Sequence, residues 1–156
     1  MRLESVLLCD FAEVRDNLLF VVAGGISRLW RSEFPGPMGV QLALIVAIEP
    51  AERNVPHELH VDVIDPSGTT IAEVRAELQL SGTVADADEV AHVPVTMDFR
   101  NVTVAVQGWH TVKVRVDDQV HAELRVKAEL RPPVSPRTVP GAGFQAPPKK
   151  RGDRPN

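Results

Sequence analysis

The sequence contains a single cysteine, Cys9, among its 156 residues, and this scarcity excludes several kinds of site. One thiol cannot form a disulfide within the chain, and it lacks the partner thiols of a CxxC redox motif or of a multi-cysteine zinc site. Because proteins of oxidising compartments commonly rely on disulfides, the composition favours a reducing compartment. We therefore predict a cytoplasmic protein.

Long hydrophobic runs are also missing. The longest strongly apolar stretch without a charge is 36–48 (GPMGVQLALIVAI), far shorter than the roughly 20 residues that span a bilayer. Near the N-terminus, Glu4 and Asp10 interrupt the apolar run that a secretory signal requires. The sequence therefore predicts no membrane span, no secretory signal and no membrane partner.

The motifs of common enzyme families are absent as well. There is no GxSxG, no P-loop and no GxGxxG followed by a helical pattern. The segment HELH at 57–60 is one residue too short for the HExxH zinc helix and lies in a strand pattern, where its two histidines point to opposite faces. Cys9 shares its strand parity with Leu7 and Phe11, which favours a buried thiol over a nucleophile. We therefore predict a protein that is not an enzyme, with no catalytic, cofactor-binding or metal-binding residues.

Positive charge is scarce in the first 130 residues. They contain 11 Lys+Arg against 20 Asp+Glu, whereas residues 131–156 contain 6 against 1. An acidic body repels phosphate backbones. We therefore expect no binding to nucleic acid, except a weak and salt-sensitive contact by the basic C-terminal segment.

What the sequence does contain is strand alternation, with valine as the recurring apolar residue. In 109–130, apolar and charged residues alternate on both sides of Asp117-Asp118-Gln119, which predicts a β-hairpin with one solvated face. A three-residue loop at this point keeps apolar residues opposite one another and places Lys113 across from Glu123.

A second hairpin is predicted by Asp65-Pro66-Ser67-Gly68, a type I turn sequence between strands at 57–65 and 70–80. Segment 39–49 is apolar at odd and even positions alike, as in a central strand covered on both faces. Two further segments complete the set, one containing paired glycines and one whose apolar parity changes near Arg100-Asn101: 17–31 and 93–106.

These seven or eight short antiparallel strands predict an all-β fold, an immunoglobulin-like two-layer β-sandwich, with closure into a barrel as the alternative. From Arg131 the alternation stops, and 131–156 carries seven prolines and a basic end. This composition predicts a disordered tail after one domain at 1–130.

Short motifs along the domain carry a family resemblance: Cys9-Asp10-Phe11-Ala12, Asn17-Leu18-Leu19 leading to Gly24-Gly25, Phe34-Pro35, Asp65-Pro66-Ser67-Gly68, and Gly108-Trp109. With these motifs, the chain resembles an uncharacterised family of small bacterial domains. The resemblance implies an immunoglobulin-like β-sandwich and assigns no activity. Many members have a tyrosine where this tyrosine-free chain has Trp109.

Asp10 is the candidate structural polar residue. Strand alternation places it beside Val6, Leu8 and Ala12, on a side that a sandwich buries. A buried carboxylate needs hydrogen-bond partners, which the backbone of the following turn or a nearby arginine would supply. We weigh this structural role against a catalytic acid or metal ligand, and favour structure because no second ligand lies within a motif's distance.

Two segments are candidates for binding. Trp30 and Arg31, close to Phe34, form a candidate interaction patch of large amphipathic side chains. The acidic loop 83–91 offers clustered carboxylates, which suit calcium, but it lacks the central glycine and distal glutamate of an EF-hand. A merely solvated loop is the preferred interpretation.

These observations predict a non-catalytic protein that binds another protein, or self-associates, through sheet edges or end loops. The alternative is a small-ligand or calcium-binding domain that uses loop 83–91.

Removal of residues 131–156 should leave the free energy of unfolding nearly unchanged, because a segment without apolar periodicity buries little surface. Thermal unfolding of a chain that ends at Leu130 tests this. Loss of the cooperative transition would show that the tail packs on the domain.

Overall fold

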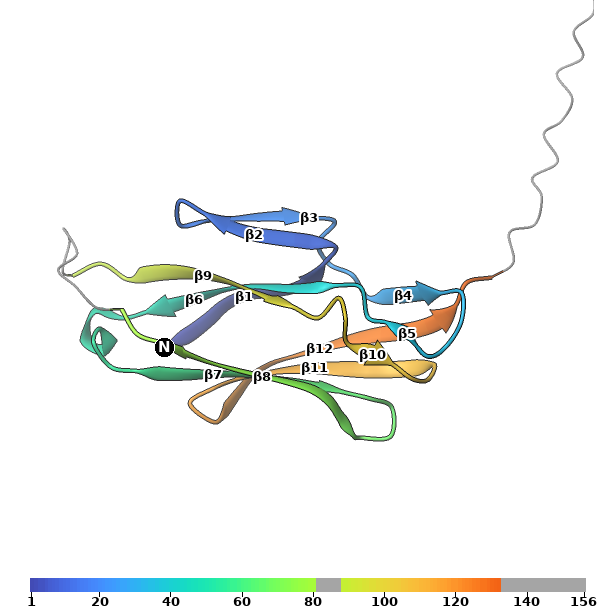
Figure 1. The fold of residues 1–156 in the computed structure, drawn as a ribbon. Helices are drawn as coiled ribbons and strands as arrows, with labels where there is room; N and C mark the ends of the chain where they lie inside the picture. Colours follow the sequence, from blue (N-terminus) through green and yellow to red (C-terminus); the bar gives the residue numbers. More distant parts are fainter. Residues whose placement is uncertain (81–87, 133–156) are drawn as a thin grey trace, which may run out of the picture.

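The computed structural model describes residues 1–80 and 88–132, which fold into strands and one short 3-10 turn, η1 (Pro50–Glu52) (Figure 1). The predicted tail lies outside the described residues from position 133 onward, and so do residues 83–87 of the acidic loop. In chain order the strands are β1 (Arg2–Cys9), β2 (Phe11–Arg15), β3 (Leu18–Val22), β4 (Arg28–Arg31), β5 (Gly36–Pro37), β6 (Gln41–Ile48), β7 (His57–Ile64), β8 (Thr70–Leu78), β9 (Ala91–Asp98), β10 (Thr103–Val104), β11 (Gly108–Val116) and β12 (Gln119–Leu130). None of the described residues forms a helix long and apolar enough to cross a membrane.

Strand β6 is the centre of a three-stranded antiparallel sheet in the order β1-β6-β9. Its side chains at even positions, such as Leu42 and Leu44, point into the main core, whereas Ala43 belongs to a small cluster on the opposite face. All of β6 except Ile45 is buried. The prediction of a central strand covered on both faces is therefore confirmed.

The second main sheet has five strands in the order β4-β12-β11-β7-β8. Valines of its inner face, such as Val61, Val114 and Val126, pack in the main core against the three-stranded sheet. Strand β4 runs parallel to β12, so the prediction of a wholly antiparallel arrangement is wrong at this edge. The reason is that the chain reaches β4 by crossing over from β3, and a crossover lets neighbouring strands run the same way.

Strands β2 and β3 form a separate hairpin over the face of the three-stranded sheet that points away from the main core (Figure 1). The all-β class is confirmed. The prediction of two layers with seven or eight strands is wrong, because it lacks the hairpin layer and the shortest strands; the described residues contain twelve strands. Short strands such as β5 and β10 pair over two residues only, too few for alternation to reveal them.

The hairpin of β11 and β12 has a two-residue loop, Asp117-Asp118, where three residues were expected. Both aspartates have positive φ angles, 47° and 64°, as in the type I′ turn that suits the twist of paired strands. A β-bulge in the pairing between Val114 and Arg115 adds the one residue by which the loop is shorter than expected. Lys113 therefore still lies opposite Glu123, its Nζ 3.1 Å from the carboxylate, which confirms the predicted pair.

Two other sequence signals are confirmed. At the turn between β7 and β8, Asp65 Oδ1 accepts hydrogen bonds from the backbone N–H groups of Ser67 and Thr69, at 2.8 and 2.9 Å. The hydrogen bond from the Ser67 hydroxyl is the main cause that lowers the pKa of Asp65. The change of parity near Arg100-Asn101 is a change of sheet, since β9 pairs with β6 and β10 pairs with β5.

Leu44→Ala should lower the free energy of unfolding by about 2–5 kcal/mol, because it removes buried methyl groups and leaves a cavity. Leu44 is fully buried between the two main sheets. Val120→Ala is the matched control, since Val120 is exposed beside the β11–β12 loop and its truncation should cost less than about 0.5 kcal/mol. Urea denaturation of both variants measures the difference, and equal stability would contradict the described core.

Candidate functional site

The β2–β3 hairpin carries half of the large hydrophobic residues that are exposed in the described parts of the chain. They are Phe11, Val14, Leu18, Phe20, Val21 and Val22. A folded domain rarely leaves a contiguous apolar patch uncovered unless the patch has a function in binding. This concentration on one small element makes the hairpin the leading candidate site.

The strand register divides the hairpin into two faces. Phe11 pairs with Val22, Glu13 with Phe20, and Arg15 with Leu18, and paired residues share a face. These six residues, here called the hairpin face, point away from the sheets, because the alternate residue Ala12 is buried against the three-stranded sheet. The four apolar members are between 41% and 61% exposed.

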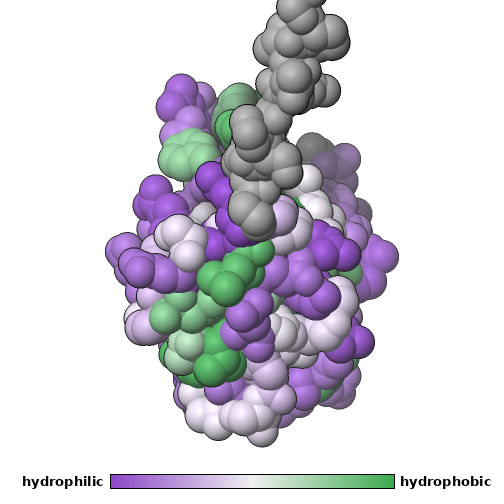
Figure 2. All heavy atoms as spheres, turned by 90° about the vertical axis from the view of Figure 1, so that its right-hand side faces the viewer, coloured by the Kyte–Doolittle hydropathy of each residue, from purple (hydrophilic) through white to green (hydrophobic). Residues whose placement is uncertain are grey.

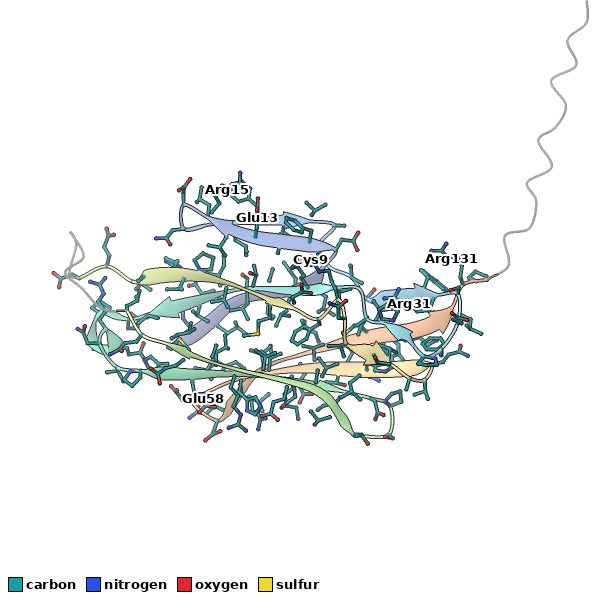
Figure 3. All side chains as sticks on the ribbon, in the orientation of Figure 1. Cys9, Glu13, Arg15, Arg31, Glu58 and Arg131 are labelled. Carbon is teal, nitrogen blue, oxygen red and sulfur yellow. The ribbon has the colours of Figure 1, made fainter. Side chains whose placement is uncertain are left out.

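The charges of the hairpin face balance each other. The Arg15 guanidinium donates a hydrogen bond to the Glu13 carboxylate at 2.7 Å and lies 5.9 Å from the centre of the Phe20 ring. Both charged side chains belong to the hairpin layer at the edge of the molecule (Figure 3). The face therefore combines apolar area with one acid and one base.

Small residues and one amide attach the hairpin to the sheet. The Gln41 side-chain oxygen accepts a hydrogen bond from Ala12 N–H at 2.6 Å, and the Cys9 thiol donates to the Gln41 carbonyl at 3.5 Å. Cys9, Ala12 and Ala43 pack together in the gap. At the exit of the hairpin, a Cβ on Gly24 would lie 2.9 Å from a methyl of Leu7, so a larger residue would require the Leu7 side chain to shift. The hairpin is thus fixed to the sheet by close packing.

Asp10 is exposed, so the prediction of a buried carboxylate is wrong. Strand β1 ends at Cys9 and β2 begins at Phe11, with Asp10 at the bend between them. The alternation of β1 therefore does not continue through Asp10. Its backbone N–H donates to Val22 O at 3.2 Å, which closes the open end of the hairpin.

The residues of the candidate patch do not share one exposed surface. Trp30 is 41% exposed, but Phe34 packs against the main core. The Arg31 guanidinium donates to the carbonyl oxygens of Pro37, at 2.6 Å, and of Met38. Burial lowers the pKa of Arg31. Arg31 and Phe34 therefore hold the loop before β6 in place, and only Trp30 is exposed for a contact.

A second apolar group lies at the end of the molecule where β4 and the C-terminal end of β12 meet. Figure 2 shows hydrophobic residues gathered there among hydrophilic ones. Val106 and Leu130 are 47% and 45% exposed. The hairpin carries more exposed large hydrophobic residues than this group, so the hairpin face is the better candidate.

The acidic loop is described only in part. Of its three acidic residues, Asp86 lies outside the described residues, and Asp88 and Glu89 are exposed. The calcium alternative therefore has no described geometry in its support.

The outer face of the five-stranded sheet is polar and charged. On β7 and β8 it gathers a histidine and two carboxylates, His60, Asp62 and Glu73, whose ligand atoms lie within 4.8 Å of one another. Sequence reasoning missed this cluster. The signal was the alternate placement of His60 and Asp62 in one strand, but Glu73 joins them only through the register of β8.

The two histidines of the HELH segment belong to different groups. His57 Nδ1 lies 2.7 Å from an Asp117 carboxylate oxygen, beside an open groove of about 400 Å³ that Glu58, Arg75 and Glu77 also line. The contact with His57 is the main cause that lowers the pKa of Asp117. His60 lies in the cluster on the outer face. The prediction that the two residues point to opposite faces agrees with this separation.

Comparisons with known proteins identify a family but no activity. A model of a protein family of unknown function (DUF6941) matches residues 4–129. No curated protein matches the chain.

A solved structure of the Pseudomonas fluorescens alkylpurine DNA glycosylase AlkC, bound to DNA containing an abasic site analog, is similar over 66% of this chain, with 15% identity and a TM-score of 0.33. The match covers only 27% of that chain. A similarity this low carries no argument about fold or function.

Cys9 should not react with a thiol reagent such as iodoacetamide at pH 8 while the protein is folded. Its side chain is fully buried, and burial, followed by the nearby Asp10 charge, raises the pKa of the thiol, so that less thiolate is present than at a free cysteine. Mass spectrometry with and without denaturant tests this. Rapid labelling of the folded protein would show that the hairpin opens readily from the sheet.

Proposed function

We propose that this chain, which belongs to the family of unknown function DUF6941, is a protein-binding module that self-associates through its hairpin face. The observation that carries the proposal is the set of apolar side chains exposed on one face of a hairpin that is itself fixed by close packing. A rigid apolar surface loses little conformational entropy when it is covered, which favours binding.

A second copy of the chain is the occupant that the charges favour. A two-fold axis between Glu13 and Arg15 brings the acid of each copy beside the base of the other. The apolar residues of the two copies then cover each other, with Phe20 at the centre. A face with one sign of charge would instead repel its own copy.

The small size of the hairpin face predicts a weak dimer. Two five-residue strands on each side bury less than the roughly 1,200 Å² at which stable specific interfaces begin. Association therefore depends on protein concentration. The unpaired outer edges of β2 and β3 offer further backbone hydrogen bonds to the second copy.

The remaining parts of the proposal rest on the sequence. We infer a non-catalytic role, an immunoglobulin-like arrangement of the two main sheets, and a bacterial, cytoplasmic setting, which the single thiol fits. The alternative, a small-ligand or calcium-binding domain, depends on loop 83–91.

Sedimentation velocity over a wide concentration range should show a monomer–dimer equilibrium that Leu18→Ser with Phe20→Ser shifts to monomer. The same type of change at another exposed apolar residue, Val120→Ser, is the matched control and should leave the equilibrium unchanged. A monomer at every concentration would reject self-association and leave a different protein as the only occupant of the face.

Charge reversal tests the arrangement of the two copies. Glu13→Arg alone and Arg15→Glu alone should each weaken the dimer, because like charges then meet across the axis. An equimolar mixture of the two variants should associate again as a heterodimer. Failure of the mixture to associate, with the wild-type dimer intact, would contradict the two-fold pairing.

A further inference from the structure

The outer face of the five-stranded sheet brings three potential ligand atoms together from β7 and β8. His60 Nε2 lies 3.0 Å from Asp62 Oδ1 and 2.9 Å from Glu73 Oε1. The side chains of His60 and Asp62 are 7% and 10% exposed, although both lie on the outer face, whereas Glu73 is 44% exposed and gives access from solvent. The cluster is therefore enclosed at its base and open on one side.

The contacts of His60 Nε2 conflict with one another when no cation is bound. Besides the two carboxylate oxygens, the Arg115 guanidinium lies 3.2 Å from the same nitrogen. A protonated Nε2 donates to the carboxylates but meets the N–H of Arg115; a deprotonated Nε2 accepts from Arg115 but directs its lone pair at two negative oxygens. Neither state satisfies all three neighbours.

A divalent cation removes this conflict, because the nitrogen lone pair and both carboxylate oxygens are attracted to it. We propose that His60, Asp62 and Glu73 bind a zinc ion, with water in the remaining position. One nitrogen and two oxygens form a donor set that zinc accepts, and the imidazole favours zinc over calcium or magnesium. Zinc binds such ligands at about 2.0–2.2 Å, which places tetrahedral ligand atoms roughly 3.3–3.6 Å apart, so His60 Nε2 needs to move away from each carboxylate oxygen by less than about 1 Å.

The arginines around the cluster fit the role of outer partners. The Arg115 guanidinium donates a hydrogen bond to Asp62 Oδ2, the carboxylate oxygen that does not face His60. This hydrogen bond orients Oδ1 toward the ion. Arg75 Nε donates to Glu73 Oε1 at 2.7 Å, and its Nη1 lies 3.5 Å from Glu58 Oε1. Because two guanidinium groups lie close to the site, we expect moderate rather than very tight zinc affinity.

This site is independent of the proposed dimer. Glu58, a residue of β7, and Glu13 of the hairpin lie on opposite sides of the molecule (Figure 3). The proposal replaces the sequence-based prediction of no metal-binding residues. Loss of zinc binding and loss of dimerisation are separate outcomes, since they involve different residues.

Isothermal titration of the chelator-treated full chain with zinc chloride should show one saturable site, and zinc should raise the melting temperature. His60→Gln and, separately, the exposed-edge variant Glu73→Gln should each lower the affinity about tenfold or more, since even outer partners of a metal contribute that much. His121→Gln is the matched control, because His121 is an exposed histidine of β12 outside the cluster.

Cobalt supplies a second measurement. Co²⁺ in the site should give visible absorption bands of a four-coordinate ion that zinc displaces and that Glu73→Gln abolishes. Absence of saturable binding would overturn the proposal. Zinc affinity that is unchanged by His60→Gln and by Glu73→Gln, or that is lost with His57→Gln, would also overturn the proposal by placing the ion elsewhere.

Discussion

Burial of β6 on both of its faces is the constraint on which the rest of the structure depends. Leucine and valine side chains on one face of β6 fill the main core, and on the other face the small residue Ala43 leaves room for the hairpin. Because small residues let backbones approach closely, the hairpin packs on the sheet through Ala12 and Leu19 of its inner face. Its outer face then has no partner within the described residues.

The two outer surfaces of the molecule differ in chemistry as a result. The outer face of the hairpin exposes apolar side chains and one ion pair, a combination that suits contact with a second protein surface. The outer face of the five-stranded sheet carries acids, bases and histidines, and ion pairs such as Arg115–Asp62 and Lys113–Glu123 join its neighbouring strands. We propose self-association on the first surface and zinc binding on the second, each from the chemistry that its own residues expose.

Asp10 shows why strand alternation failed near the hairpin. A period of two predicts faces only while a strand continues, and β1 ends one residue before Asp10. The local signal for this bend is Asp10 alone, a residue type that is rare in strands and common in turns, between residues of strong strand propensity. The same reason explains Phe11, which was placed with Cys9 and is exposed on the hairpin face instead. In contrast, Lys113 and Glu123 were paired correctly, because a long hairpin constrains its own register.

The sequence by itself determined the all-β class, the central position of β6, the turn at Asp65 and the burial of Cys9, because each depends on local periodicity, turn chemistry or side-chain polarity. Tertiary structure alone decided which strands became neighbours. The hairpin layer, the parallel pairing of β4 and the meeting of His60 with Glu73 are of this kind. They arise from register and packing between segments that are distant in sequence. Such contacts depend on both partners, so neither segment alone predicts them.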